Sequence, residues 1–207
     1  MLSQVSRVSA VRTMRALLRA VSIDDIVLDA IKRETALIRG SFYGTMLRNE
    51  IFDFSQLGTY VERADNTARI LDVKYYVLLP SISWVGSSLD NYQWESILRS
   101  VSAHRSYRWV YEADYKPTNI ADYLILNVRM PRSLTFCYRF LAEHLKFLGD
   151  DYGERHACHA TADRTQAMLR AGSIKDIFDT GLHEFLANFI RDNTRLGDEI
   201  AQDYKFY

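Results

Sequence analysis

Apolar residues recur at intervals of three and four positions along most of this 207-residue chain. The longest regular series lies within residues 54–78 and comprises Phe54, Leu57, Val61, Ala64, Ala68, Leu71, Tyr75 and Leu78. Such spacing places side chains on one stripe of a helix that packs against other helices. We therefore predict a long helix that begins at about Thr45 or Asn49 and runs to residue 79, where Pro80 ends it.

A second long helix is predicted near the C-terminus, over about residues 173–206. Ser173 and Asp176 match a capping box at its start, and apolar residues continue at helical spacing to Ile200. No stretch of the sequence shows the alternation that is typical of a strand. The fold class expected is all-α, a single helical bundle built around the two long helices with shorter helices between them.

Glycine and proline are scarce, with nine and three residues, so each is expected to mark a boundary. Gly40 is expected to end a helix that begins near Ser22. Gly149 is expected to end a helix whose first turn contains Pro131. Residues 81–91 are expected to form a loop.

The composition is that of a globular protein, with 48% hydrophobic and 25% charged residues. Twenty-six basic residues balance twenty-six acidic ones, so the basic excess typical of nucleic-acid binding is missing. The two cysteines, Cys137 and Cys158, form no Cys-x-x-Cys pair and suit a reducing compartment. The apolar runs are too short for a transmembrane helix. We expect a cytoplasmic protein that binds neither nucleic acid nor a membrane.

The first 22 residues have a composition of their own, with several arginines and serines and no acidic residue. Organelle transit peptides share this composition. The same residues also carry an apolar strip at helical spacing, so the sequence favours an ordinary first helix.

Charged and amide side chains lie beside the apolar stripe of the predicted long helix. Glu62, Asn66 and Arg69 are four and then three residues apart, so they share one face. Because burying arginine or glutamate is costly unless partners are supplied, a neighbouring helix that partly covers them is expected to provide such partners. The candidate polar cluster comprises Glu62, Arg63, Asn66, Arg69 and Asp72, with Arg132, His183 and Glu184 as candidate partners from neighbouring helices.

Two interpretations of this cluster compete. In the first, it is an interhelical salt-bridge network, with Glu62 paired to an arginine of another helix and Arg69 held between Asp65 and Asp72. In the second, it is a site that binds a carboxylate, a phosphate or a peptide backbone. Residue chemistry by itself favours the network, because ion-pair networks are common.

Motifs of familiar metal and cofactor sites do not fit. His183 and Glu184 lack the second histidine of a zinc-protease motif, because Ala187 stands in its place. No glutamate is followed three residues later by histidine, which excludes the di-iron pattern, and no phosphate-binding loop occurs. Ligand-type side chains gather at Glu154, His156, Cys158 and His159. On a helix His156 and Cys158 point to different faces, so adventitious surface binding is favoured over a zinc site. We expect no metal and no cofactor.

Thirteen tyrosines are present, and a middle group comprises Tyr75, Tyr76, Tyr107, Tyr111, Tyr115 and Tyr123. Tyrosine is enriched both at protein interfaces and at core margins that touch solvent. Both interpretations stay open.

The segment from Tyr60 to Val73 has the sequence Tyr-Val-Glu-Arg-Ala-Asp-Asn-Thr-Ala-Arg-Ile-Leu-Asp-Val. It resembles the bacterial alpha-E domain, a helical family named for its Glu-Arg motif. Further similar segments are 45–48, 72–81, 131–133 and 181–186, so the resemblance covers about residues 30–207. Family members usually carry the Glu-Arg helix twice in tandem, whereas this chain has it once. We expect a single domain over 1–207, in which residues 1–30 are a divergent N-terminal helix, the remnant of a lost first repeat.

The resemblance implies a helical component of a bacterial ATP-dependent system for peptide synthesis or modification. The partners it implies are an ATP-grasp-type carboxylate–amine ligase and a transglutaminase-like protein. Because no nucleotide-binding motif is present, an accessory or co-catalytic role is expected. The alternatives are a stand-alone enzyme acting on a peptide or amino-acid carboxylate at the Glu-Arg cluster, and a purely structural bundle that forms homo-oligomers. The sequence assigns no catalytic residue.

Overall fold

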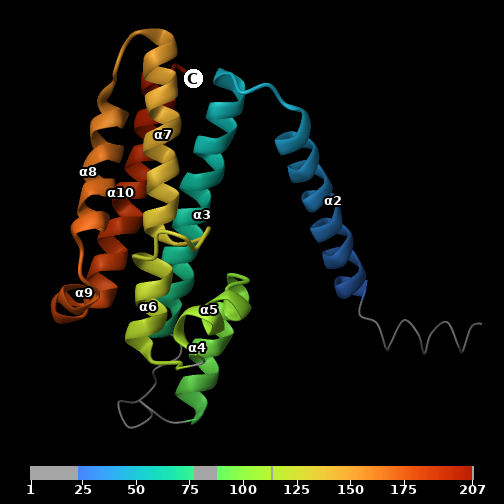
Figure 1. Ribbon diagram of the computed structural model, residues 1–207, viewed down its shortest axis with the longest axis vertical. Helices are drawn as coiled ribbons and strands as arrows, with labels where there is room; N and C mark the ends of the chain where they lie inside the picture. Colours follow the sequence, from blue (N-terminus) through green and yellow to red (C-terminus); the bar gives the residue numbers. More distant parts are fainter. Residues whose placement is uncertain (1–22, 77–87, 113, 207) are drawn as a thin grey trace, which may run out of the picture. The chain divides into compact units, whose positions relative to one another are not determined.

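The computed structural model describes residues 23–76, 88–112 and 114–206. In these ranges the chain forms nine α-helices and no strand, which confirms the all-α fold class (Figure 1). None of the described helices combines the length and the hydrophobicity needed to span a bilayer. The helix expected within residues 1–22 lies outside the described residues.

The chain divides into two compact units, residues 1–47 and residues 48–207. Whether residues 1–207 form a single domain, as expected from the sequence, stays a prediction. In the first unit the described element is α2 (Ile23–Thr45). It continues through Gly40, so the expectation that this glycine ends the helix is wrong. A helix tolerates an interior glycine at a cost of about 1 kcal/mol relative to alanine, which longer stretches of good helix formers offset.

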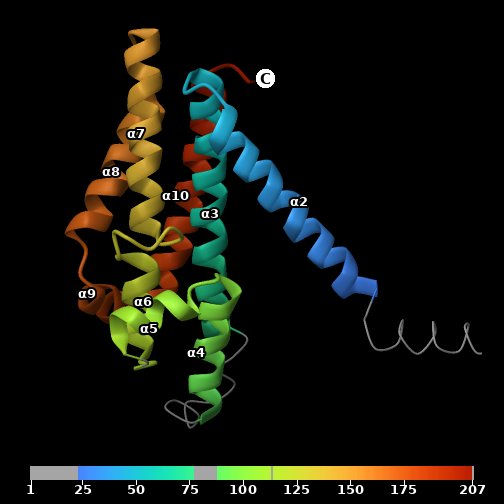
Figure 2. The same cartoon turned by 45° about the vertical axis from the view of Figure 1, so that its right-hand side comes forward.

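The second unit contains eight helices. They are α3 (Glu50–Tyr76), α4 (Ser88–Ser100), α5 (His104–Tyr111), α6 (Pro117–Ile125), α7 (Leu134–Tyr152), α8 (Ala157–Ala171), α9 (Ile174–Thr180) and α10 (Leu182–Asp203). Helices α3, α7, α8 and α10 form a four-helix bundle in which each helix packs against two of the others (Figures 1 and 2). The short helices α4, α5, α6 and α9 gather at the end of the bundle where α3 reaches Tyr76.

The predicted apolar stripe of α3 faces the core of this bundle. Leu57, Ala64, Ala68 and Leu71 are all almost completely buried. The helix begins at Glu50, in agreement with the second of the two predicted starts, and the Asn49 side chain accepts a hydrogen bond from the Phe52 backbone N–H at 3.3 Å. The predicted end at Pro80 lies outside the described residues. Alanines in the stripe allow the neighbouring helices to approach α3 closely.

The long C-terminal helix predicted over 173–206 is two helices, α9 and α10, separated by Gly181. This residue has φ +111°, a conformation that glycine adopts readily, and a Cβ added to it would lie 2.1 Å from Oε2 of Glu184. The predicted capping box is also wrong, because the Ser173 side chain makes no capping hydrogen bond. The break lets α10 start in a new direction and presents its first turn to α3.

Three further boundaries differ from expectation. Helix α7 begins after Ser133, whose hydroxyl accepts a hydrogen bond from the Phe136 N–H at 3.0 Å, so Pro131 precedes the helix. Gly149 lies inside α7, where a Cβ would approach Nε2 of His159 to 3.0 Å, so this glycine serves close packing of α8. Of the loop expected over 81–91, residues 81–87 lie outside the described residues and the rest form the first turn of α4.

The middle group of tyrosines lies in part within the core of the short helices. Tyr107 and Tyr123 are buried, and the ring centroids of Tyr107 and Tyr111 lie 4.9 Å apart. The hydroxyl of Tyr111 donates to the Asp122 carboxylate. Burial raises the pKa of both Tyr107 and Tyr111. Intramolecular packing therefore accounts for these rings, whereas the side chains of Tyr75 and Tyr76 lie outside the described part of the chain.

Candidate functional site

The predicted polar cluster is distributed over different sides of α3. Glu62, Asn66 and Arg69 form an exposed stripe on the second unit. Nε of Arg69 donates to Oδ2 of Asp65, one turn earlier in the same helix, at 2.7 Å, and this bond raises the pKa of Arg69. The Arg69 side chain remains 57% exposed. The expectation that a neighbouring helix partly covers Glu62 and Arg69 is therefore not met by the helices described in this unit.

Arg63 points to a different side of α3 and is partly buried. Its Nη1 donates to the carbonyl oxygen of Pro131 at 3.2 Å, and its guanidinium lies 5.2 Å from the centroid of the Tyr60 ring. The charges of Arg63 and Arg132 both act on Cys137 and favour its thiolate, yet burial raises the pKa of this thiol to about 12. The structure thus brings these two arginines to the start of α7, where Arg63 ties α3 to the preceding turn.

Asp72 and His183 meet across the interface between α3 and α10. Oδ1 of Asp72 and Nδ1 of His183 lie 2.7 Å apart, and each side chain is 19% exposed. The break at Gly181 places His183 in the first turn of α10, which faces α3. Glu184, the next residue, is exposed and packs near Gly181 instead. The predicted cluster therefore yields one close interhelical pair, while Arg69 is held by Asp65 and not by Asp72.

A second charged pair lies close to this one and was not predicted. Nζ of Lys74 donates to Oδ1 of Asp90 at 2.5 Å and to Oε1 of Gln93 at 2.6 Å. The Lys74 side chain is only 3% exposed, and its Nζ lies 5.5 Å from the Trp94 ring centroid. Lys74 follows Leu71 by three residues. A lysine next to the apolar stripe was therefore the sequence signal that could have predicted a buried ion pair. An ion pair buried this deeply is maintained only with good geometry and extra hydrogen bonds.

Both pairs line one cavity of about 370 Å³, which we call the Asp72–His183 cavity. Its apolar wall comes from α3, α4, α6, α9 and α10 and consists of Leu71, Trp94, Pro117, Phe178, Leu182 and Leu186. Small-molecule sites commonly have about 300–1,000 Å³ of volume, apolar walls and a few polar groups that orient the ligand. Among the described residues that line this cavity, none is a serine, a threonine or a cysteine. The arrangement suits binding of an apolar group beside an ionisable one.

The ligand-type residues near the start of α8 have structural roles. Nδ1 of His159 accepts a hydrogen bond from the His156 N–H at 3.0 Å, and its Nε2 donates to the carbonyl oxygen of Leu145 at 2.8 Å. Burial raises the pKa of the Cys158 thiol to about 12. Within the described ranges no group of three or more histidine, cysteine or acidic side chains is arranged to hold a metal ion.

Comparison with known proteins supports the family resemblance seen around Glu62 and Arg63. A model of the Alpha-E family, described as a predicted alpha-helical domain with a conserved ER motif, matches residues 3–204. The chain therefore belongs to the alpha-E family, a class of helical domains. Searches among curated proteins and among solved structures find no match.

Proposed function

We propose that this protein is a helical accessory or co-catalytic component of a bacterial ATP-dependent system for peptide synthesis or modification. In this proposal its partners are an ATP-grasp-type carboxylate–amine ligase and a transglutaminase-like protein. The Asp72–His183 cavity binds part of the peptide or amino-acid substrate. The observation that carries the proposal is one cavity of about 370 Å³ that joins an apolar wall to a histidine–aspartate pair.

The chemistry of the pair suits the two ends of an amino acid. Asp72 accepts the Nδ1–H of His183 and thereby fixes the orientation of the imidazole ring. The second ring nitrogen is an acceptor in the neutral form, able to take a proton from an ammonium group. In the protonated form it is a donor that pairs with a carboxylate. The apolar wall suits a hydrophobic side chain of the same substrate.

Activation of a carboxylate by ATP is assigned to the partner. The sequence contains no phosphate-binding loop. Nζ of Lys74 is taken up by hydrogen bonds to Asp90 and Gln93 and its side chain is only 3% exposed, so this amine is not assigned as a nucleophile. Among the described lining residues none carries a hydroxyl or a thiol, so no serine, threonine or cysteine nucleophile is assigned there.

A stand-alone enzyme is the second candidate. A carboxylate that orients a histidine through Nδ1 is the arrangement of a general base, and here it would activate water rather than a side chain. Turnover of a peptide or amino-acid substrate by the purified protein without a partner would establish this candidate and reject the accessory role.

The test compares His183→Asn with Glu184→Gln. Asparagine retains a donor toward Asp72 but cannot titrate, whereas Glu184 is exposed and does not line the cavity. Ligase activity with ATP, amino acids and peptides is measured with and without this protein. We expect His183→Asn to lower the partner-dependent rate by about a hundredfold, the lower end for loss of a general acid–base group, and Glu184→Gln to leave it unchanged.

Partner contact is tested separately by pull-down of the ligase with Glu62→Ala and Arg63→Ala. Loss of ligase binding in either variant, with helicity retained, supports the accessory role. Unchanged binding together with unchanged ligase activity in His183→Asn leaves the purely structural bundle.

A further inference from the structure

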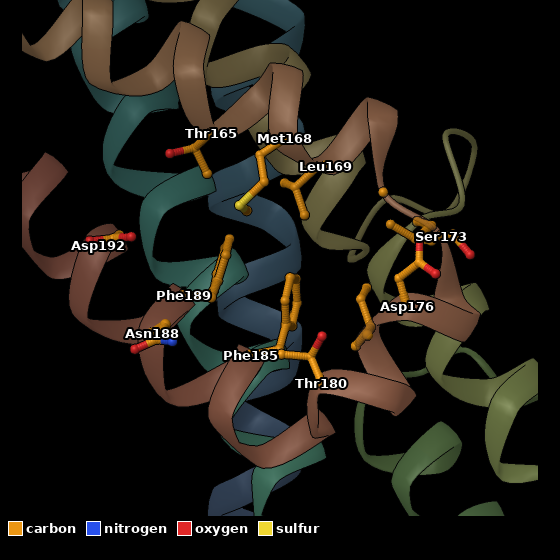
Figure 3. A pocket seen from close by; sticks show the side chains of 13 residues that line it. Thr165, Met168, Leu169, Ser173, Asp176, Thr180, Phe185, Asn188, Phe189 and Asp192 are labelled. Atoms are coloured by element: carbon orange, nitrogen blue, oxygen red, sulfur yellow. The ribbon is translucent and has the colours of Figure 1, made fainter.

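A second cavity, of about 310 Å³, lies between α8, α9 and α10. Figure 3 shows its apolar surface, in which Met168 and Leu169 of α8 face Phe185 and Phe189 of α10. Leu169 and Phe189 are almost fully buried, while Met168 is 46% exposed. The apolar surface therefore consists of tightly packed side chains, with the flexible Met168 side chain at the solvent-exposed edge.

The charge of this cavity has a single sign. Its thirteen described lining residues include Asp176 and Asp192 and no lysine, arginine or histidine. Figure 3 shows the two aspartates at opposite ends of the apolar row. The remaining polar lining residues are hydroxyl or amide side chains, which accept hydrogen bonds as readily as they donate them.

Cationic side chains beside these residues have other partners or are shared between partners. Nη2 of Arg191 donates to Oδ1 of the lining residue Asn188 at 2.8 Å. Nη2 of Arg195 lies 3.4 Å from Asp192, and its Nε lies 3.5 Å from Glu199. Lys175 pairs with Asp179 at 2.6 Å. Among the described residues, no lysine or arginine lies within ion-pair distance of Asp176. The cavity thus combines apolar walls with an exposed carboxylate that has no ion-pair partner among the described residues.

We propose that this cavity binds a small amphipathic cation, a primary ammonium that carries an aromatic or branched alkyl group. The apolar group lies against Phe185, Phe189 and Met168, and the ammonium lies at Asp176. Asp192 adds a weaker attraction from the other end because Arg195 shares its charge. The volume, at the lower limit of small-molecule sites, suits a single such group rather than a folded segment.

Charge is tested with three probes that share one ring. Phenethylamine, phenethyl alcohol and phenylpropionate are titrated into the full chain, and binding is followed by protein-observed NMR. We expect saturable millimolar binding of the amine, weaker binding of the alcohol and none of the carboxylate. Equal binding of the amine and the alcohol, or no saturable binding of the amine, would overturn the proposal.

Location is tested by a matched pair at Met168, since this side chain is half exposed and tolerates substitution. Met168→Lys and Met168→Glu remove the same apolar contact and add opposite charges. We expect Met168→Lys to weaken phenethylamine binding at least tenfold relative to Met168→Glu, and Asp176→Asn to weaken it about threefold to tenfold, since the carboxylate is exposed. Equal affinity in the two Met168 variants places the amine elsewhere and rejects this site. Asp150→Asn, on the exposed face of α7 and outside both cavities, should leave amine binding unchanged, and a loss there also rejects the assignment.

Discussion

Helix α3 carries charged side chains of the same kinds and holds them in two different ways. On the exposed stripe, Arg69 pairs with Asp65 in the same helix and stays 57% exposed. Toward the end of the helix, Asp72 reaches His183 of α10, and Lys74 reaches Asp90 of α4 with only 3% of its side chain exposed. The first arrangement is a local pair in solvent, and the second joins three helices.

The difference concerns what each charge does for the fold. A solvated pair one turn apart contributes a few tenths of a kcal/mol, because water solvates each partner equally well when the pair is broken. A buried pair stabilises the fold only while both partners are present. Removal of one partner leaves the other charge without water or a counter-ion. Four predictions follow this contrast, from the strongest effect to the weakest.

Asp90→Ala is expected to lower the free energy of unfolding by about 3–5 kcal/mol, because it leaves the Lys74 ammonium buried and unpaired. Urea denaturation measures the loss. The control is Asp65→Ala on the exposed stripe, which should cost less than about 1 kcal/mol. Replacing both partners, Lys74→Met with Asp90→Leu, should recover much of the loss. If Asp90→Ala costs no more than Asp65→Ala, the buried pair and the solvated pair do not differ as described.

Burial also decides the reactivity of the two thiols, one of which, Cys137, lies near Arg63 at the start of α7. The pKa values of Cys137 and Cys158 are raised to about 12, chiefly by burial. Both groups therefore stay protonated at pH 8, and their thiolate fraction is on the order of a thousandfold below that of an ordinary thiol. An aromatic disulfide reagent at pH 8 should modify neither residue in the folded protein and both in urea. Rapid modification of Cys137 in the native state would show that the charges of Arg63 and Arg132 lower its pKa more than burial raises it.

Gly181→Ala is expected to destabilise the protein by about 1–3 kcal/mol, because alanine is strained at φ +111°. The change should also weaken the contact between His183 and Asp72, because Gly181 sets where α10 begins. Gly58→Ala is the control on α3, since nothing lies within 4 Å of the added Cβ. Alanine there should stabilise the helix by up to about 1 kcal/mol. Thermal unfolding compares the two variants. Equal effects would mean that the backbone conformation at residue 181 does not require glycine.

Arg69→Ala should change the free energy of unfolding by only about 0.3–0.5 kcal/mol, and high salt should abolish that difference. Arg63→Ala should cost about 1 kcal/mol or more, because this guanidinium donates to the Pro131 carbonyl and covers the Tyr60 ring. Denaturation at low and high salt separates the two arginines. An Arg69→Ala loss as large as that of Arg63→Ala would assign a structural role to the exposed stripe.

Helix type and the identity of the core stripe could be predicted from the sequence. Leu57, Ala64, Ala68 and Leu71 recur with a helical period, and that period is a local property of the backbone. The family resemblance rests on the same stretch, because the Glu-Arg motif lies inside this helix. Termini were predicted less well. Pro131 and Ser133 both suit a helix start, and only the local hydrogen bond of Ser133 decides between them. An interior glycine such as Gly149 depends on which helix packs beside it.

The candidate site depended on the tertiary structure. Periodicity places Glu62, Arg63, Asp72 and Lys74 beside the stripe, yet it does not say which margin α4 and α10 cover. The positive φ of Gly181 turns the chain so that His183 reaches Asp72 over 111 residues of separation. The sequence by itself determined the helices and their buried stripe, because helical spacing and apolar burial act over short stretches of chain. Only the packing of α4 and α10 against α3 decided which charges are buried, paired and placed around a cavity.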